Sequence, residues 1–162
     1  MTSLTTHTQD IAAHLKAMKQ TIGVAESSTG GLISAALLAV PGASAYYLGG
    51  TVIYTLRARR DLLGIDDATL ARQEPLTADY VTLCADTIRE RLGATWGIAE
   101  LGATGPAGTP YGHPPGICVI AVSGPLTRTV RIETGSADRE ANMQIFARTA
   151  FDLLQQTLAA SR

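Results

Sequence analysis

The stretch TIGVAESSTGGLISAALLAV, residues 21–40, decides how this 162-residue chain begins to fold. Its first part, TIGVA, is a short apolar run of the kind found in strands that are buried on both faces of a sheet. Its last part, TGGLISAALLAV, is apolar enough for a packed helix and stops at Pro41-Gly42, a common helix end. The hydroxyl-rich segment AESSTGG, residues 25–31, therefore lies at a predicted strand-to-helix junction.

The rest of the chain continues this alternation of strands and helices. We expect further helices over residues 4–20, 56–65, 68–73, 77–93 and 136–160, and further strands over residues 50–55, 95–102, 117–124 and 127–134. The last of these strands, TRTVRIET, alternates apolar and polar residues as an exposed strand of a hairpin does. Interleaved strands and helices followed by a hairpin predict an α/β fold, a three-layer α/β/α sandwich with a mixed sheet. We expect one domain over residues 1–162.

Composition and charge narrow the class of protein. Hydrophobic residues make up 46% of the chain and charged residues 17%, as in compact globular proteins. The formal net charge is −1 without a cationic block, so we expect no nucleic-acid partner. Cys84 and Cys118 have neither CxxC spacing nor a nearby histidine pair, which argues against a metal site and a disulfide scaffold. Without a long apolar run or a signal-peptide pattern, we expect no membrane partner and a cytoplasmic location.

Three segments rich in hydroxyl groups or glycine follow predicted strands. They are ESSTGG at residues 26–31, YTLRARR at residues 54–60 and GATGPAGTP at residues 102–110. In open α/β sheets, ligands bind beyond the carboxyl ends of the parallel strands. We therefore expect these segments, which lie far apart in the sequence, to converge on one site.

The first segment admits more than one interpretation. Ser28 or Thr29 could simply cap the helix by accepting hydrogen bonds from its first amides. Alternatively, the amides of Gly30 and Gly31 could bind an anion, either a phosphate or the oxyanion formed when a nearby serine attacks a carbonyl. The GxxxxGKS or GxxxxGKT pattern of a phosphate-binding P-loop is absent.

The other two segments offer charge and an adaptable backbone. Arg57, Arg59 and Arg60 follow Tyr54 and suit a phosphate or carboxylate ligand, although a solvated helix face would look the same. The glycine- and proline-rich loop at residues 102–116 allows its backbone to approach a ligand closely. Loops of about this length inside a compact domain usually bind or gate something.

These motifs together resemble the C-terminal domain of the competence-damage-inducible CinA proteins. The resemblance rests on TIGVAESSTGGLISAALLAVPGASAYYLGGTVIY, LLGI, GATGPAGTP, GICVIAV and SADRE in this order, and it covers roughly residues 10–158. It implies a mixed, mostly parallel five-stranded sheet and a homo-oligomer, here as a C-terminal domain without the N-terminal CinA domain. It also implies hydrolysis of the carboxamide of nicotinamide mononucleotide, a pyridine nucleotide, to nicotinic acid mononucleotide and ammonia, with no metal and no organic cofactor.

The same resemblance assigns roles to individual residues. The nucleophile falls on Ser27, and the catalytic positions near the second strand fall on Tyr54 and Arg59. SADRE supplies Arg139 as a phosphate ligand, which could reach across a subunit interface. The residues expected to bind the substrate are Ser28, Thr29, Gly30, Gly31, Gly102, Thr104, Gly105 and Arg139.

Two departures from the family pattern bear on the mechanism. Arg59 stands where the family typically has a lysine, which can lose its proton and act as the base for a serine. Arginine, with a pKa above about 12, cannot do so. Leu101 replaces a hydroxyl-bearing residue. Tyr54, with Arg59 favouring the loss of its proton, or His113 are the alternative bases; otherwise the chain is a nucleotide- or partner-binding relative without turnover.

Overall fold

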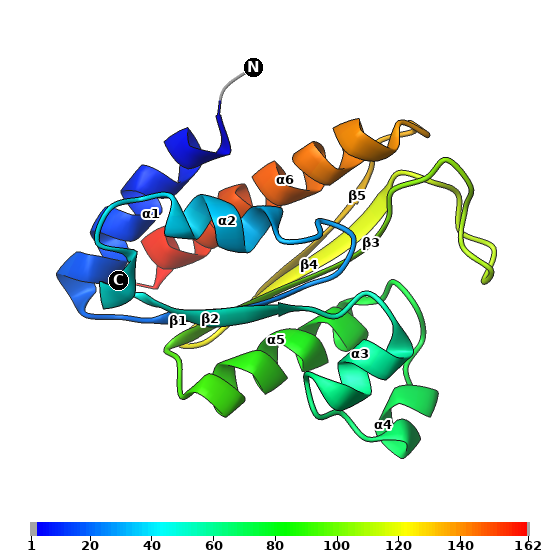
Figure 1. Ribbon diagram of the computed structural model, residues 1–162, viewed down its shortest axis with the longest axis horizontal. Helices are drawn as coiled ribbons and strands as arrows, with labels where there is room; N and C mark the ends of the chain where they lie inside the picture. The colour runs from blue at the N-terminus through cyan, green and yellow to red at the C-terminus, as the bar shows by residue number, and fades with distance from the viewer. Residues whose placement is uncertain (1–2, 162) are drawn as a thin grey trace.

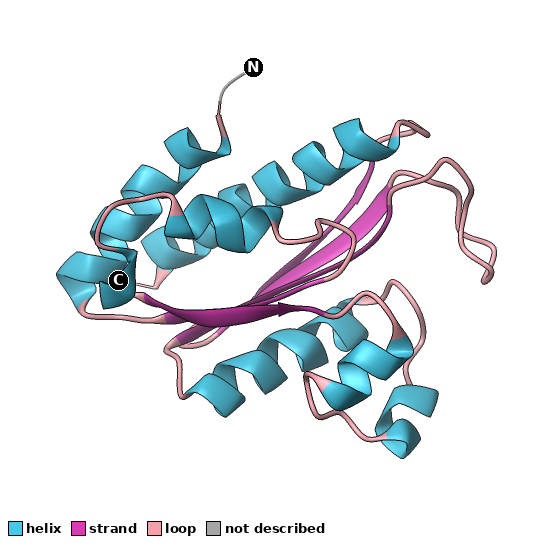
Figure 2. Ribbon diagram, viewed as in Figure 1, coloured by secondary structure: helices cyan, strands magenta, loops and turns pink. Residues whose placement is uncertain are grey.

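The computed structural model describes residues 3–161, and it places a five-stranded sheet between two layers of helices (Figures 1 and 2). Helices α1, α2 and α6 cover one face of the sheet, and α3, α4 and α5 lie on the other. The helices are α1 (Leu4–Met18), α2 (Leu32–Leu38), α3 (Leu56–Asp61), α4 (Asp67–Ala71), α5 (Ala78–Leu92) and α6 (Arg139–Ala160). This arrangement confirms the predicted α/β/α sandwich.

The strand order in the sheet is β2-β1-β3-β4-β5. The strands are β1 (Ile22–Glu26), β2 (Tyr47–Val52), β3 (Trp96–Ala103), β4 (Ile117–Ser123) and β5 (Arg128–Glu133). β1 pairs in parallel with β2 and β3, whereas β3–β4 and β4–β5 are antiparallel. Among the five strands of residues 3–161, β4 alone therefore runs against the others, and the mixed sheet is confirmed.

Several elements start or end at places that the sequence pattern did not predict, and two of them, β2 and α2, border the strand ends where the site was expected. β2 ends at Val52 rather than near residue 55, because Thr55 leaves the sheet to cap α3 and accepts a hydrogen bond from the Ala58 amide at 3.1 Å. α2 begins at Leu32 rather than at residue 29. Gly30 and Gly31 have φ angles of +64° and +106°, which are not helical and which glycine adopts without a steric penalty.

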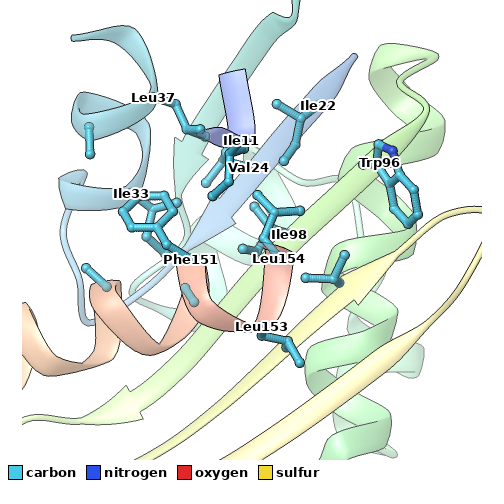
Figure 3. Packing of buried hydrophobic residues seen from close by; sticks show 14 of the residues in the cluster. Ile11, Ile22, Val24, Ile33, Leu37, Trp96, Ile98, Phe151, Leu153 and Leu154 are labelled. Atoms are coloured by element: carbon cyan, nitrogen blue, oxygen red, sulfur yellow. The ribbon is translucent and has the colours of Figure 1, made fainter. Parts of the chain in front are cut away.

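The pleat of the central strands separates two hydrophobic cores. Figure 3 shows Val24 and Ile98 on the same side of the sheet as Phe151 and Leu154 of α6, in the cluster under α1, α2 and α6. Ala25 belongs to the opposite cluster, against α5. Successive side chains of a strand point to opposite faces. By this alternation, Glu26 at the end of β1 points toward α2 and α6, and the next residue points toward α3 and α5.

The outer strand β5 is exposed along one side and closes a hairpin with β4, as its alternating sequence predicts. No helix within residues 3–161 combines the length and apolar character needed to cross a bilayer. Cys84 and Cys118 are both buried as free thiols.

Candidate active site

A buried glutamate shapes the strand-to-helix junction. The Glu26 carboxylate, at the end of β1, accepts hydrogen bonds from the amides of Gly31 at 2.8 Å, Ile33 at 3.1 Å and Ser34 at 2.9 Å. These are among the first amides of α2, which have no partner within the helix itself. The two left-handed glycines fold the chain back over the strand end, so that one carboxylate reaches all three donors.

The predicted cap by Ser28 or Thr29 is therefore wrong. The N-cap position is Gly31, which has no side chain to offer, and the Glu26 carboxylate takes the role instead. The amides expected to bind an anion are also engaged. Gly30 N–H donates to the Ser27 carbonyl at 3.1 Å and Gly31 N–H donates to Glu26, so neither is open to a phosphate or an oxyanion.

A second buried glutamate, which the sequence analysis missed, forms hydrogen bonds with the hydroxyls of Ser28 and Thr29. Glu100 of β3 pairs in register with Glu26 and has no exposed surface. It accepts hydrogen bonds from the Ser28 hydroxyl and from the amides of Ser27 and Thr29, both at 3.0 Å. Thr29 Oγ1 lies 2.8 Å from Glu100 Oε2 and also 2.8 Å from Glu26 Oε1. The sequence signal for Glu100 was a single acid inside the apolar strand WGIAELGA.

Ser27 differs from the two residues that follow it. Its amide donates to the Glu100 carbonyl at 3.1 Å and to the Glu100 carboxyl at 3.0 Å, which fixes its backbone. Its side chain lines a cavity on the α5 side of the sheet. Across the described part of the chain, the Ser27 hydroxyl has no hydrogen-bond partner. Of the three successive hydroxyls, it is the one left open to a ligand.

The cavity brings the three predicted segments together. Its volume is about 430 Å³, within the range of small-molecule sites. The wall includes Ser27 from the first segment, Tyr54 and Arg59 from the second, and Gly102 from the third. Leu101 also lines the wall, so the family's missing hydroxyl leaves an apolar surface there. Tyr80 of α5 and Tyr111 of the long loop add two more aromatic rings.

Arg59 lies in the cavity wall, but its hydrogen bonds go to groups other than Tyr54. Its Nε donates to the Ile53 carbonyl at 3.1 Å, and its Nη1 donates to the Tyr80 hydroxyl at 2.7 Å. The guanidinium also lies 4.9 Å from the centre of the Tyr80 ring. Burial raises the pKa of Tyr80, and the Arg59 hydrogen bond only partly opposes that shift. The expected action of Arg59 on Tyr54 is thus wrong, and Arg59 instead links the segment after β2 to α5.

The arginine beside Tyr54 is Arg139. Its Nη2 donates to the Tyr54 hydroxyl at 3.3 Å, and its Nη1 donates to the carbonyl of Gly105. Asp138 caps α6 by accepting from the Ala141 amide at 3.0 Å, which places Arg139 in the first turn. The start of α6 is thereby joined to the end of β2 and to the loop after β3.

The remaining predicted residues do not line the cavity. Thr104 is buried, and its carbonyl accepts from Asn142 Nδ2 at 2.9 Å; Gly105 serves only as the acceptor for Arg139. His113 pairs through Nδ1 with the Thr109 hydroxyl at 2.9 Å, so it forms part of the loop rather than a base at the cavity.

Two of the three arginines that follow Tyr54 point away from the cavity as well. Arg57 and Arg60 bond to Asp61 on the surface, at 3.2 Å and 2.8 Å, as a solvated helix face does. Within residues 3–161, no three histidine, cysteine, aspartate or glutamate side chains come together as a metal site would require.

The comparisons with known proteins identify the family. Residues 4–158 match the sequence model of the CinA C-terminal domain. The chain belongs to this family. A CinA-like protein of Gloeobacter violaceus is 36% identical over 149 residues, which cover 91% of this chain and 35% of that protein. A CinA-like protein of Synechococcus is 38% identical over 115 residues, 71% of this chain and 28% of its own length. The chain thus spans about a third of the curated relatives it matches.

Solved structures agree over the whole domain. A competence-damaged protein (CinA) superfamily protein from Klebsiella pneumoniae superposes with a TM-score of 0.90 at 30% identity, covering 98% of this chain and 99% of that one. A competence/damage-inducible protein from Agrobacterium tumefaciens gives a TM-score of 0.88 at 26% identity, with 97% and 96% covered. The CinA resemblance of the sequence is confirmed.

Proposed function

We propose that this CinA-family chain is a nicotinamide-nucleotide amidohydrolase with Ser27 as its nucleophile. The observation that carries the proposal is the contrast among three successive hydroxyls. Ser28 and Thr29 are bonded to buried carboxyls, whereas Ser27 faces the cavity without a partner in the described chain. A serine held at a strand end by its own backbone, with a free hydroxyl, is placed to attack a bound carbonyl. The proposal includes a cytoplasmic homo-oligomer, as the family resemblance implies.

The proposed reaction proceeds through a covalent intermediate. Ser27 Oγ attacks the carboxamide carbon of nicotinamide mononucleotide and loses its proton, and the carbon–nitrogen bond breaks. The nitrogen takes up that proton and leaves as ammonia, and the nicotinoyl group remains as an ester on Ser27. Water then attacks the ester, which releases nicotinic acid mononucleotide and returns the proton to Ser27. The sum is one nucleotide and one water converted to the acid and ammonia.

Tyr54 is the group we assign to carry the proton. It lines the same cavity as Ser27, and the Arg139 guanidinium donates to its hydroxyl at 3.3 Å. A cation at this distance stabilises the negative charge on the phenol oxygen once it has lost its own proton, the form that can take the proton of Ser27. Proton transfer by a positioned side chain typically contributes about 10²–10⁴-fold to the rate. The pair of Tyr54 and Arg139 thus takes the place that the family's lysine would fill.

The cavity walls also suit the substrate. The nicotinamide ring of the substrate is flat and carries a positive charge, and such rings are attracted to the faces of aromatic side chains. Tyr54, Tyr80 and Tyr111 offer three such side chains around the cavity. Arg139 at the edge of this region is the candidate partner for the 5′-phosphate, since guanidinium groups bind phosphate oxygens strongly.

The test is ammonia release from nicotinamide mononucleotide. Wild type should turn over, and Ser27→Ala should lose at least about 10³-fold in kcat, as removal of a serine nucleophile does. Ser44→Ala, which changes an exposed serine far from the cavity, is the matched control and should behave as wild type. Unimpaired turnover by Ser27→Ala would exclude Ser27 as the nucleophile.

One observation favours a second function, a nucleotide-binding module without turnover. Arg59 occupies the family's lysine position and is engaged by Ile53 and Tyr80, so no titrating amine faces Ser27 from there. Titration calorimetry with nicotinamide mononucleotide separates the two functions. Binding without ammonia release, in both wild type and Ser27→Ala, would favour the module.

A further inference from the structure

Two buried acids lie side by side beneath the junction that carries Ser27. Glu26 and Glu100 face each other across β1 and β3, and neither has exposed surface. Both point toward α2 and α6, on the side of the sheet opposite the cavity. Within residues 3–161, neither carboxyl forms an ion pair with a lysine, arginine or histidine. Two ionised carboxylates this close, without a cation, would be strongly destabilising.

The hydroxyl between the two acids ties them together without neutralising their charge. Thr29 Oγ1 is 2.8 Å from Glu26 Oε1 and 2.8 Å from Glu100 Oε2, and both distances are those of hydrogen bonds. A hydroxyl has a single proton and no charge, so it offers the two carboxyls one shared donor and no counter-ion. Two adjacent buried carboxyls without a cation therefore favour a pair that holds one proton.

The hydrogen bonds around each acid identify the one that carries it. Glu26 accepts from three amides spread over both of its oxygens, which an ionised carboxylate satisfies. Glu100 accepts its two amides on Oε2 alone. Its Oε1 faces only the Ser28 hydroxyl and, at 3.8 Å, the thiol of Cys118. Oε1 is thus the oxygen with room for a proton, and a proton there would reverse the Ser28 bond, so that the acid donates to Ser28 Oγ.

The remaining surroundings point the same way. Burial raises the pKa of Glu100 above its ordinary value, although hydrogen bonds from the junction oppose the shift. The other titratable groups near the pair are Cys118 on β4 and Tyr47 on β2, and burial raises the pKa of each, so both are neutral at physiological pH. The groups that α2 and α6 place near the pair carry no charge. They are backbone amides of α2 and the Phe146 ring of α6, which lies beside Gly102.

We propose that Glu100 is a neutral carboxylic acid paired with an ionised Glu26, and that this one-proton pair is a positioning device for Ser27. Glu100 holds the amides on both sides of Ser28, at Ser27 and Thr29, and so fixes the backbone from which the Ser27 hydroxyl projects into the cavity. Its effect on catalysis rests on the proposed amidohydrolase function. The protonation of the pair does not rest on that function, and it can be measured separately.

The first test is the pH dependence of unfolding. In the unfolded chain a glutamate titrates near its ordinary pKa of about 4.3. Above that pH, and until the raised pKa of Glu100 is passed, the folded protein holds one proton more than the unfolded chain. Stability therefore falls as pH rises, and the unfolding equilibrium constant grows by about tenfold per pH unit from this group. Glu100→Gln, which mimics the neutral acid, should remove that contribution.

The comparison of the two proteins isolates Glu100 from other groups. Histidines and surface acids titrate in both wild type and Glu100→Gln, so the difference between the urea midpoints of the two proteins across pH 5–9 reports the proton of the Glu26–Glu100 pair. A difference that changes with pH as described supports the proposal. A difference that is constant with pH would overturn it. If Glu100→Gln does not fold, infrared spectroscopy of wild type in D₂O decides, because a buried neutral acid gives a carboxyl C=O band that an ionised pair lacks.

The second test concerns the positioning of Ser27. Glu100→Leu removes the carboxyl that accepts from the Ser27 and Thr29 amides and leaves Ser27 only the Glu100 carbonyl, and we expect kcat for ammonia release to fall at least tenfold with a smaller change in KM. Glu100→Gln keeps an oxygen for these amides and an N–H for Ser28, and it should recover most of that loss. Equal damage from both variants would exclude the neutral acid. If wild type releases no ammonia, the amidohydrolase proposal fails, while the unfolding comparison still decides the protonation of the pair.

Discussion

The two sides of the sheet at the end of β1 differ sharply, although adjacent residues supply them. All three residues are buried, but on the α2 side the hydroxyls of Ser28 and Thr29 are bonded to Glu26 and Glu100. On the α5 side, Ser27 faces a cavity whose rim includes Tyr111, which is 63% exposed. Adjacent residues thus point to opposite faces of the sheet: the hydroxyls on one face stabilise the fold, and the hydroxyl on the other face is open to a ligand. A cluster of serine and threonine residues in a sequence therefore does not indicate which hydroxyl is reactive.

The largest effect on stability should come from a substitution on the α2 side of the sheet, the closed side, where Glu26 and Glu100 bind the junction. Glu26→Ala leaves the amides of Gly31, Ile33 and Ser34 without their acceptor, whereas the Thr29 hydroxyl keeps Glu100. A buried polar group that loses its partner costs about 1–3 kcal/mol, so the sum approaches the whole stability of an ordinary domain. We expect a loss of several kcal/mol in urea unfolding, or no folded protein at all.

The matched control for this variant is Glu133→Ala on the exposed strand β5. Glu133 pairs with Arg131 at 3.3 Å, but its side chain is 62% exposed, and such surface pairs contribute about 0–1 kcal/mol. A Glu26→Ala protein as stable as Glu133→Ala would contradict the view that the closed side is structural.

The contrast also marks how far the sequence could predict the site. The buried strand and the convergence of three segments follow from local pattern and from the rule on strand ends, and the structure agrees. The turn at Gly30 and Gly31 was not predicted, because the apolar pattern placed both glycines inside the helix. The partners of Ser28 and Thr29 could not be predicted, because Glu100 reaches them only through the parallel register of β1 with β3. Local propensity favours a hydroxyl cap, but a carboxylate that accepts three amides satisfies more donors than a hydroxyl can.

The two arginines at the site, Arg59 and Arg139, also show that closeness in the sequence does not predict which side chains touch. The family resemblance assigned Arg59 to act on Tyr54, which is close to it in the chain, yet the guanidinium of Arg59 bonds to Tyr80. Arg139 is far along the chain and reaches Tyr54 because α6 begins beside the end of β2. A resemblance to a family can assign such residues to a site, but only the fold shows which one touches which.

A moderate effect should come from altering the open side at Arg139. Arg139→Lys keeps the charge but loses the planar fork that bridges the Gly105 carbonyl and the Tyr54 hydroxyl. We expect kcat/KM for nicotinamide mononucleotide to fall by about 10–100-fold, which corresponds to the 1.5–3 kcal/mol typical of a hydrogen bond to a charged group. Thermal unfolding should change little, because this region is exposed.

The control for Arg139 is Arg57→Lys, since Arg57 bonds only to Asp61 and its side chain is 84% exposed. It should leave kcat/KM unchanged. If Arg139→Lys instead lowers stability as much as activity, Arg139 would belong with the structural contacts of the closed side, and the division between the two sides would have to be redrawn.

The smallest effect should come from the rim at Tyr111. The turn from Thr109 to His113 is closed by the hydrogen bond from the Thr109 amide to the His113 carbonyl at 2.9 Å. The Tyr111 ring therefore extends from an ordered loop. An aromatic contact of this kind contributes about 0.5–1.5 kcal/mol, and Tyr111→Ala should therefore raise KM by about 2–12-fold with kcat unchanged. Tyr111→Phe keeps the ring and should retain the wild-type KM, as steady-state kinetics will check. Equal losses in both variants would assign the contact to the hydroxyl rather than to the ring, and a fall in kcat with constant KM would move Tyr111 from the rim to the reacting groups around Ser27.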